Sequence, residues 1–85
     1  MIIDFTKPAE KQTKKLPQKI KKKFLKQLSF LQTDFNYPSL YAKKMKDSGR
    51  WEARIDYHYR FSFDVEDEII TITSVGMHDF GLGKK

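Results

Sequence analysis

The hydrophobic pattern of this chain changes period near its middle, which restricts the folds that it can adopt. Between Pro17 and Phe35 the apolar residues recur at steps of three or four, at Ile20, Phe24, Leu28, Leu31 and Phe35. This spacing is typical of a helix with one buried stripe. From Trp51 onward, apolar and polar residues alternate instead, as in strands with one buried face. The sequence therefore predicts an α+β protein with its helices before most of its strands.

Two further elements are expected before the long helix. Met1–Phe5 is rich in Ile and Phe, which favours a short strand. Thr6 can cap a following helix that has Pro8 in its first turn. This first helix should run to about Leu16, because Pro17 stops it and can open the next one.

The second half predicts four strands separated by short polar segments. The expected strands are Leu40–Lys46, Trp51–Ile55, Tyr59–Val65 and Ile69–Val75. Short turns between successive strands favour antiparallel pairing. The predicted order is β-α-α-β-β-β-β, with two N-terminal helices packed on one face of a twisted, mainly antiparallel sheet. Residues 1–85 are expected to form a single domain, because a chain of this length has room for one core.

Composition excludes several kinds of site. The chain has no cysteine, so a disulfide framework, a thiolate zinc site and a thiol nucleophile are all excluded. Its two histidines, His58 and His78, are too few for a histidine-built metal site, and we expect no metal and no cofactor. No apolar run is long enough to span a membrane, and the N-terminus does not have the pattern of a signal peptide. The expectation is a soluble, cytoplasmic protein.

The charge is distributed unevenly along the chain. Residues 1–46 contain twelve lysines and three acidic residues, a net charge of +9, whereas residues 47–85 have a net charge of −3. All three arginines lie in the second half, at Arg50, Arg54 and Arg60. Lysine is a flexible point charge, whereas the planar arginine fork suits a phosphate held in fixed geometry. The lysines thus indicate a surface that attracts polyanions, or simply a solvated helix face, and Arg54 and Arg60 indicate a defined phosphate site.

Four short motifs occur in order between Leu40 and Phe80. They are Ala42-Lys43-Lys44-Met45-Lys46, Ser48-Gly49-Arg50-Trp51-Glu52 followed by Arg54-Ile55, Tyr59-Arg60-Phe61-Ser62-Phe63, and Val75-Gly76-Met77-His78-Asp79. In this order and spacing they resemble the RelE/ParE superfamily of bacterial type II toxins, whose element order is also the one expected here.

The resemblance implies a function and a set of partners. RelE-like members enter the ribosomal A site, cut mRNA there, and are held inactive by a cognate antitoxin. The implied function is a ribosome-dependent mRNA endonuclease that represses translation, with an antitoxin, the ribosome and mRNA as partners. Two alternatives stay open, a ParE-like toxin that inhibits DNA gyrase without chemistry and a non-toxic basic RNA-binding module.

The resemblance also implies functional positions. Cleaving RNA without a metal requires activation of the 2′-OH, stabilisation of the pentacoordinate phosphate and protonation of the leaving 5′-oxygen. We expect Arg60 to stabilise the transition state and Arg54 to anchor the substrate phosphate. His78 is the expected general acid, since an imidazole titrates near neutral pH. The general base is either a lysine of residues 43–46, with Lys44 as the candidate, or Glu52.

Structural explanations compete with these roles. Arg54 could pair with Glu52 along its strand, and Arg60 could pair with Asp56 across a turn. His78 could be an ordinary exposed histidine, and Trp51 is expected to pack in the core.

Further residues are expected to bind RNA or the ribosome. They are Lys19, Lys22, Lys23, Lys26, Lys43, Lys46, Tyr57, Tyr59 and Phe80. The two tyrosines could stack on bases or merely finish a strand. Phe80 follows Asp79, where RelE-like nucleases often have a tyrosine; a phenylalanine can stack but cannot donate a proton.

Overall fold

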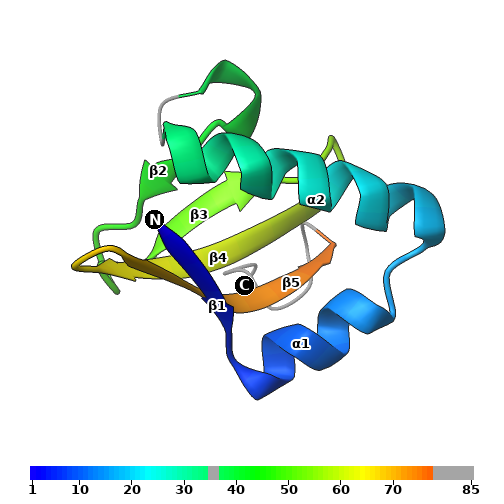
Figure 1. Ribbon diagram of the computed structural model, residues 1–85, viewed down its shortest axis with the longest axis horizontal. Coiled ribbons are helices and arrows are strands. Elements are labelled where there is room, and N and C mark those ends of the chain that lie inside the picture. Colours follow the sequence, from blue (N-terminus) through cyan, green and yellow to red (C-terminus); the bar gives the residue numbers. More distant parts are fainter. Residues whose placement is uncertain (35–36, 78–85) are drawn as a thin grey trace.

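The computed structural model describes residues 1–34 and 37–77. Figure 1 shows a twisted sheet with α2 lying across one face and α1 beside β5. In chain order the elements are β1 (Ile2–Phe5), α1 (Lys7–Lys14), α2 (Gln18–Thr33), the short 3₁₀ helix η1 (Pro38–Leu40), β2 (Lys43–Lys44), β3 (Trp51–Arg54), β4 (Tyr59–Glu66) and β5 (Ile69–Met77). The predicted α+β fold and element order are confirmed.

The five strands form one sheet in the order β1-β5-β4-β3-β2. Strands β2 to β5 form the predicted antiparallel meander. Strand β1 pairs parallel with β5, from Ile2 opposite Ile69 to Phe5 opposite Ile72. The first and last strands are therefore neighbours, with the two helices in the connection that follows β1.

Helix α1 begins as predicted. The side chain of Thr6 accepts a hydrogen bond from the backbone N–H of Ala9 at 3.2 Å, and Pro8 lies in the first turn. This capping bond satisfies one of the N–H groups that have no partner within a helix. The helix ends at Lys14, slightly before the expected end at Leu16.

Helix α1 also covers an open edge of β5. Beyond Ile72 this edge has no strand partner, because the chain leaves β1 and enters the helix. The Thr6 hydroxyl donates to the carbonyl of Thr73 at 3.4 Å, and the Val75 N–H donates to Oε1 of Gln12 at 2.7 Å. Side chains thus take the place of a longer β1 along this edge.

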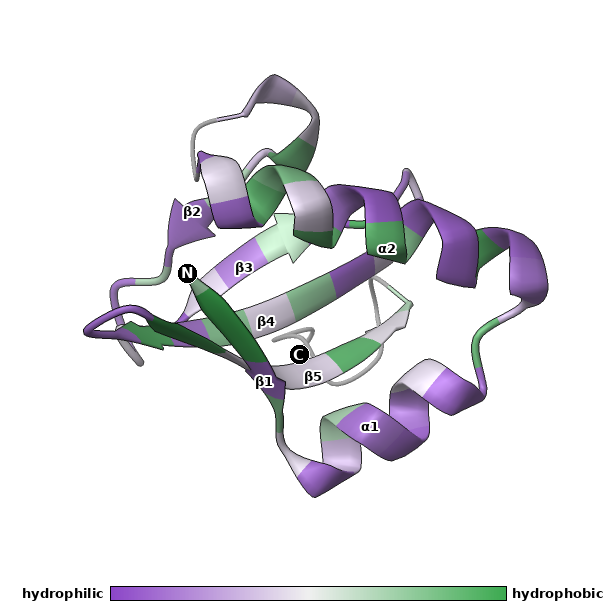
Figure 2. Ribbon diagram, viewed as in Figure 1, coloured by the Kyte–Doolittle hydropathy of each residue, from purple (hydrophilic) through white to green (hydrophobic). Residues whose placement is uncertain are grey.

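The core lies between α2 and the sheet. Buried apolar side chains of α2 are Ile20, Phe24, Leu28 and Leu31. Their partners on the sheet include Phe61 and Phe63, both fully buried, and the rings of Phe24 and Phe61 lie 5.0 Å apart. Figure 2 shows hydrophilic and hydrophobic residues alternating along α2, as the helical spacing predicted.

Two predicted boundaries were wrong. The strand expected over Leu40–Lys46 is reduced to Lys43–Lys44, because Leu40 ends η1 and Tyr41 takes a left-handed backbone conformation with φ 48°. A left-handed residue interrupts a strand. The long helix ends at Thr33, with Asp34 as its extended cap, whereas the apolar spacing predicted an end at Phe35.

Gln27 ties α2 to two other parts of the chain. Its Nε2 donates to the carbonyl of Ser39 at 2.9 Å and to that of Arg54 at 2.7 Å, and its Oε1 accepts from the Ser39 hydroxyl at 2.9 Å. The side chain is buried, so these bonds are shielded from water. One glutamine therefore fixes η1 and the end of β3 against the helix.

Asp56 organises the turn between β3 and β4. Its Oδ1 accepts hydrogen bonds from the backbone N–H groups of His58 and Tyr59 at 2.9 and 3.0 Å, and its Oδ2 lies 3.6 Å from Nζ of Lys23. Burial raises the pKa of this carboxyl, but the two backbone N–H groups and the charge of Lys23 outweigh that effect. The pKa of Asp56 consequently lies below its ordinary value.

Replacing Gln27 by leucine should destabilise the fold, because the carbonyls of Ser39 and Arg54 then lose the donor of two part-buried hydrogen bonds. We expect the free energy of unfolding to fall by about 2 kcal/mol or more, measured by urea denaturation. Gln32→Leu on the same helix is the matched control, since Gln32 makes one exposed bond, to the carbonyl of Met1. Its cost should stay below about 1 kcal/mol. Equal losses in the two variants would contradict the role given to Gln27.

The stability contributed by Asp56 should depend on pH. A carboxyl whose pKa is lowered by folding stabilises the protein above its unfolded pKa, and this contribution is lost as the pH falls through the folded pKa. Asp56→Ala should cost about 1–2 kcal/mol at pH 7 and less at pH 2. Asp56→Asn retains an acceptor for the turn and should cost less at pH 7. An Asp56→Ala penalty that is the same at both pH values would rule out this explanation.

Candidate functional site

The register of β3 and β4 brings two arginines face to face. Arg54 lies directly opposite Arg60, and the neighbouring pair is Ala53 opposite Phe61. Because Phe61 packs against Phe24 of α2, the side chains of Phe61 and of Ala53 opposite it face the helices. Successive side chains of a strand point to opposite faces, so the arginine pair lies on the face of the sheet that α2 does not cover.

Neither guanidinium is neutralised by a carboxylate in the described part of the chain. The ion pairs there join Lys23 to Asp56 and Arg50 to Asp64. The Nε atoms of Arg54 and Arg60 are buried and have no hydrogen-bond partner among the described residues. Like charges placed opposite each other on neighbouring strands destabilise a sheet. An oxyanion bound between the two guanidinium groups would offset this repulsion and stabilise the pair.

The two competing ion pairs are not found in residues 1–34 and 37–77. Glu52 lies on the arginine face, yet no ion pair joins it to Arg54 in the described structure. Asp56 is engaged by the turn backbone and by Lys23 instead of Arg60. Within residues 1–34 and 37–77, neither arginine is therefore paired with a carboxylate.

The candidates for the general base lie on different faces of the sheet, because side chains alternate along a strand. Lys43 lies opposite Glu52, which itself lies opposite Ser62, so these three side chains share the arginine face. Lys44 lies opposite Trp51, on the side of the sheet that carries α2. Glu52 is buried, and both lysines are exposed. The register therefore brings Glu52 and Lys43 to the arginine face and does not bring Lys44 there; exposed Lys46 follows in the turn after β2.

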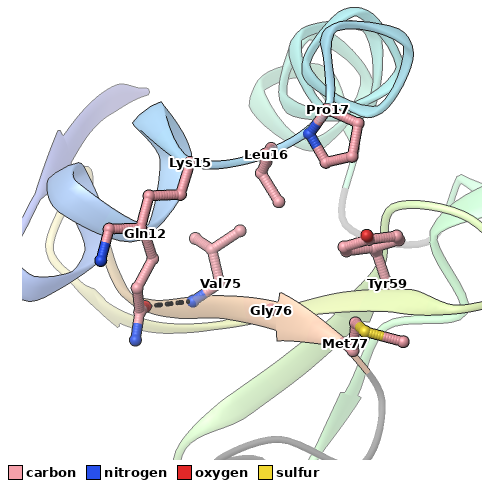
Figure 3. A pocket seen from close by; sticks show the side chains of 8 residues that line it. All are labelled: Gln12, Lys15, Leu16, Pro17, Tyr59, Val75, Gly76 and Met77. Atoms are coloured by element: carbon pink, nitrogen blue, oxygen red, sulfur yellow. Dashed lines mark hydrogen bonds between the residues drawn. The ribbon is translucent and has the colours of Figure 1, made fainter.

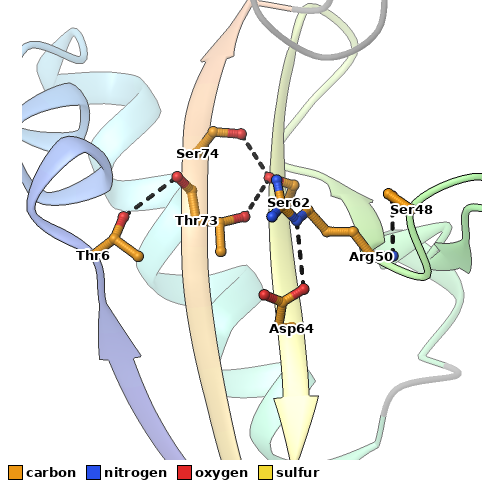
Figure 4. A network of polar contacts seen from close by, with 7 residues as sticks. All are labelled: Thr6, Ser48, Arg50, Ser62, Asp64, Thr73 and Ser74. Carbon is orange, nitrogen blue, oxygen red and sulfur yellow. Dashed lines mark hydrogen bonds and ion pairs between the residues drawn. The ribbon is translucent and has the colours of Figure 1, made fainter.

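A row of hydroxyl groups continues the arginine face. A β-bulge between Ser62 and Phe63 leaves Thr73 as an extra residue in β5, and Oγ of Ser62 lies 2.7 Å from Oγ1 of Thr73 and 2.6 Å from Oγ of Ser74. Figure 4 shows this row, with Arg50 reaching across to Asp64, whose Oδ1 lies 3.5 Å from its Nε. Sequence reasoning missed this network; the Thr-Ile-Thr-Ser run in β5 was its only signal.

The aromatic candidates occupy different places. Tyr59 faces the connection at Leu16 and Pro17 and lines an apolar pocket of about 260 Å³ on the helix-covered side (Figure 3). Trp51 packs almost parallel to Phe63, with ring centroids 6.0 Å apart, which confirms the expected packing role. Tyr57 is highly exposed in the β3–β4 turn. Tyr59 therefore does not join the arginine face.

The lysines of α2 form a second basic surface. Lys19, Lys22, Lys23 and Lys26 are exposed on the helix. Lys23 also binds Asp56, so part of its charge is used to hold the β3–β4 turn. Lys23 and Lys26 line one pocket together with Arg54, so the lysine surface of α2 reaches the end of β3 that carries this arginine.

Tyr41 is a neighbour of Arg54 that sequence reasoning did not identify. Its ring centroid lies 4.1 Å from Cζ of Arg54, within the range of a cation–π contact. The contact depends on the left-handed backbone at Tyr41, and no local sequence pattern indicated that conformation.

Two of the expected functional residues, His78 and Phe80, lie outside the described residues. Within those residues there is no group of three or more histidines and carboxylates suited to a metal ion. Neither described helix has the length and apolar character required of a membrane span.

The fold is shared with solved toxin structures. No protein-family model matches this sequence, and no curated protein gives a significant match. A chain of the archaeal RelE–RelB complex from Pyrococcus horikoshii is 20% identical, with 94% of this chain and 97% of that chain covered and a TM-score of 0.78.

Two further structures agree with this comparison. YoeB from Staphylococcus aureus, solved as a dimer, is 24% identical over 92% of this chain and 97% of its own, with a TM-score of 0.77. A YoeB/ParE toxin from Agrobacterium tumefaciens is 13% identical over 92% and 99%, with a TM-score of 0.79. The chain thus has the fold of the RelE and YoeB toxins.

Proposed function

We propose that this protein is the toxin of a type II toxin–antitoxin system and acts as a ribosome-dependent mRNA endonuclease. The observation that carries the proposal is the Arg54–Arg60 pair, two guanidinium groups on neighbouring strands with no carboxylate partner in the described structure. The four motifs that resemble the RelE/ParE superfamily and the fold shared with RelE and YoeB support the same assignment.

The arrangement suits phosphodiester cleavage. Arg60 would stabilise the negative charge of the pentacoordinate phosphate, and Arg54, opposite it, would hold the substrate phosphate. His78 is proposed as the general acid on the sequence evidence alone. For the general base, the shared face of Glu52 and the arginines favours Glu52 over Lys44.

The proposed partners follow from charge and from the similar structures. Exposed lysines on α2 would attract the phosphates of ribosomal RNA, and mRNA would lie on the arginine face. Solved RelE and YoeB structures include complexes with RelB and YefM. We therefore propose a cognate antitoxin that blocks the arginine face of this chain.

A ParE-like gyrase inhibitor is the second candidate. It is favoured by the similarity to the Agrobacterium protein, which is described as a YoeB/ParE toxin. A protein that acts by binding alone has no evident need for two unpaired arginines on one sheet face. Expression that causes filamentation and DNA damage while mRNA stays intact would favour this candidate. Absence of any effect on growth would favour a non-toxic RNA-binding module.

Arg60→Ala should abolish toxicity while leaving the fold intact. Removing a group that stabilises the transition state typically slows catalysis by at least about 100-fold. The melting temperature should stay the same or rise, because the substitution removes one of two opposed like charges. Mapping mRNA 5′ ends after expression should show codon-phased cuts for the wild type and none for the variant. A large drop in melting temperature would instead assign Arg60 a structural role.

Glu52→Gln should slow cleavage more than Lys44→Gln does. A general base contributes about 100- to 10,000-fold to a rate, and Gln is nearly isosteric with Glu but cannot accept the proton. Single-turnover cleavage of mRNA on ribosomes, followed across pH, should show loss of the acidic-limb dependence, the fall in rate as the base becomes protonated, in Glu52→Gln only. The assignment fails if Lys44→Gln shows the larger rate loss.

A further inference from the structure

Tyr41 covers one face of the Arg54 guanidinium. Its ring centroid lies 4.1 Å from Cζ, and the electron-rich ring face attracts the cation. A cation–π contact does not require a hydrogen bond from the guanidinium, so the ring need not consume its N–H donors. The contact therefore orients the fork of Arg54 without occupying its donors.

The backbone that presents Tyr41 is in a conformation rare for tyrosine. It is left-handed, with φ 48° and ψ 42°, a state that costs a residue other than glycine about 1–3 kcal/mol. The loop is held by the bonds from Gln27 to Ser39, and the same glutamine donates to the carbonyl of Arg54. One buried side chain thus fixes both partners of the ring contact.

The outer side of the Tyr41 ring is open to solvent. The residue is 65% exposed although it is a large aromatic side chain, and it lies beside Arg54, which has no carboxylate partner among the described residues. A ligand that complements this surface carries a negative charge for the arginines and a flat apolar group for the ring. A nucleotide has both, a phosphate and a base.

We propose that Tyr41 is a positioning and base-stacking residue, whose inner ring face holds Arg54 for the phosphate while its outer face stacks on a neighbouring nucleobase. This inference deepens the proposed function and rests on it for the choice of RNA as ligand. In this proposal, η1 and Tyr41, the residue that follows it, orient the substrate strand.

Fluorescence of a short RNA tests the stacking. The probe is a tetranucleotide with 2′-O-methyl groups, which prevent cleavage, and one 2-aminopurine, whose fluorescence is quenched on stacking. The free wild-type protein and Tyr41→Phe should quench it. Tyr41→Leu should lose the quenching and bind about 5- to 150-fold more weakly, the range for one base–aromatic stack. Leu25→Ala is the matched control, because Leu25 is 67% exposed and lies on α2.

Nitrogen-15 relaxation of the arginine Nε–H groups tests the positioning. The order parameter of Arg54 should fall in Tyr41→Leu and be restored in Tyr41→Phe, while that of Arg60 stays unchanged and reports an intact fold. Wild-type affinity or a wild-type Arg54 order parameter in Tyr41→Leu overturns the proposal, as does a wild-type protein that fails to quench the probe. Neither readout uses ribosomes or cleavage, so this proposal can fail while Arg60-dependent cleavage stands, and the reverse.

Discussion

Phe61 and Phe63 of β4 are both fully buried against the helix layer, and their place in the core determines which side chains the other sheet face carries. Since strand side chains alternate, Arg60 and Ser62 must point away from α2. If the register of β4 shifted by one residue, the side chain of Arg60 would point toward α2 and into the core. An unpaired charge costs far more free energy there than in water. The hydrophobic core therefore specifies the candidate site.

The charges of this small protein are segregated in a way that favours an anion. Two carboxylates of the β3–β4 hairpin are engaged by other groups, Asp56 by the turn backbone and Lys23, and Asp64 by Arg50. Among the described residues, no carboxylate pairs with Arg54 or Arg60, which lie opposite each other. In the proposed function, a bound phosphate would offset the repulsion between these two like charges.

The sequence predicted the features that depend on local periodicity, and the rest depends on distant contacts. Helix α2 and strands β3 to β5 follow from the spacing of their apolar residues. The parallel pairing of β1 with β5, the bulge at Thr73 and the left-handed Tyr41 do not, because each is fixed by partners far away in the chain. The choice between Lys43 and Lys44 likewise depends on the register of a two-residue strand, which no alternation could reveal.

Strand β5 lies between β1 and β4, so the earliest and the latest parts of the chain meet only at this strand. During synthesis the N-terminal strand has no partner until residues 69–77 have left the ribosome. Contacts of such long sequence separation form late, because the loop between them must close first. The sheet is consequently completed only when β5 inserts between β1 and β4, so the support of β4 on its β5 side is among the last contacts to form.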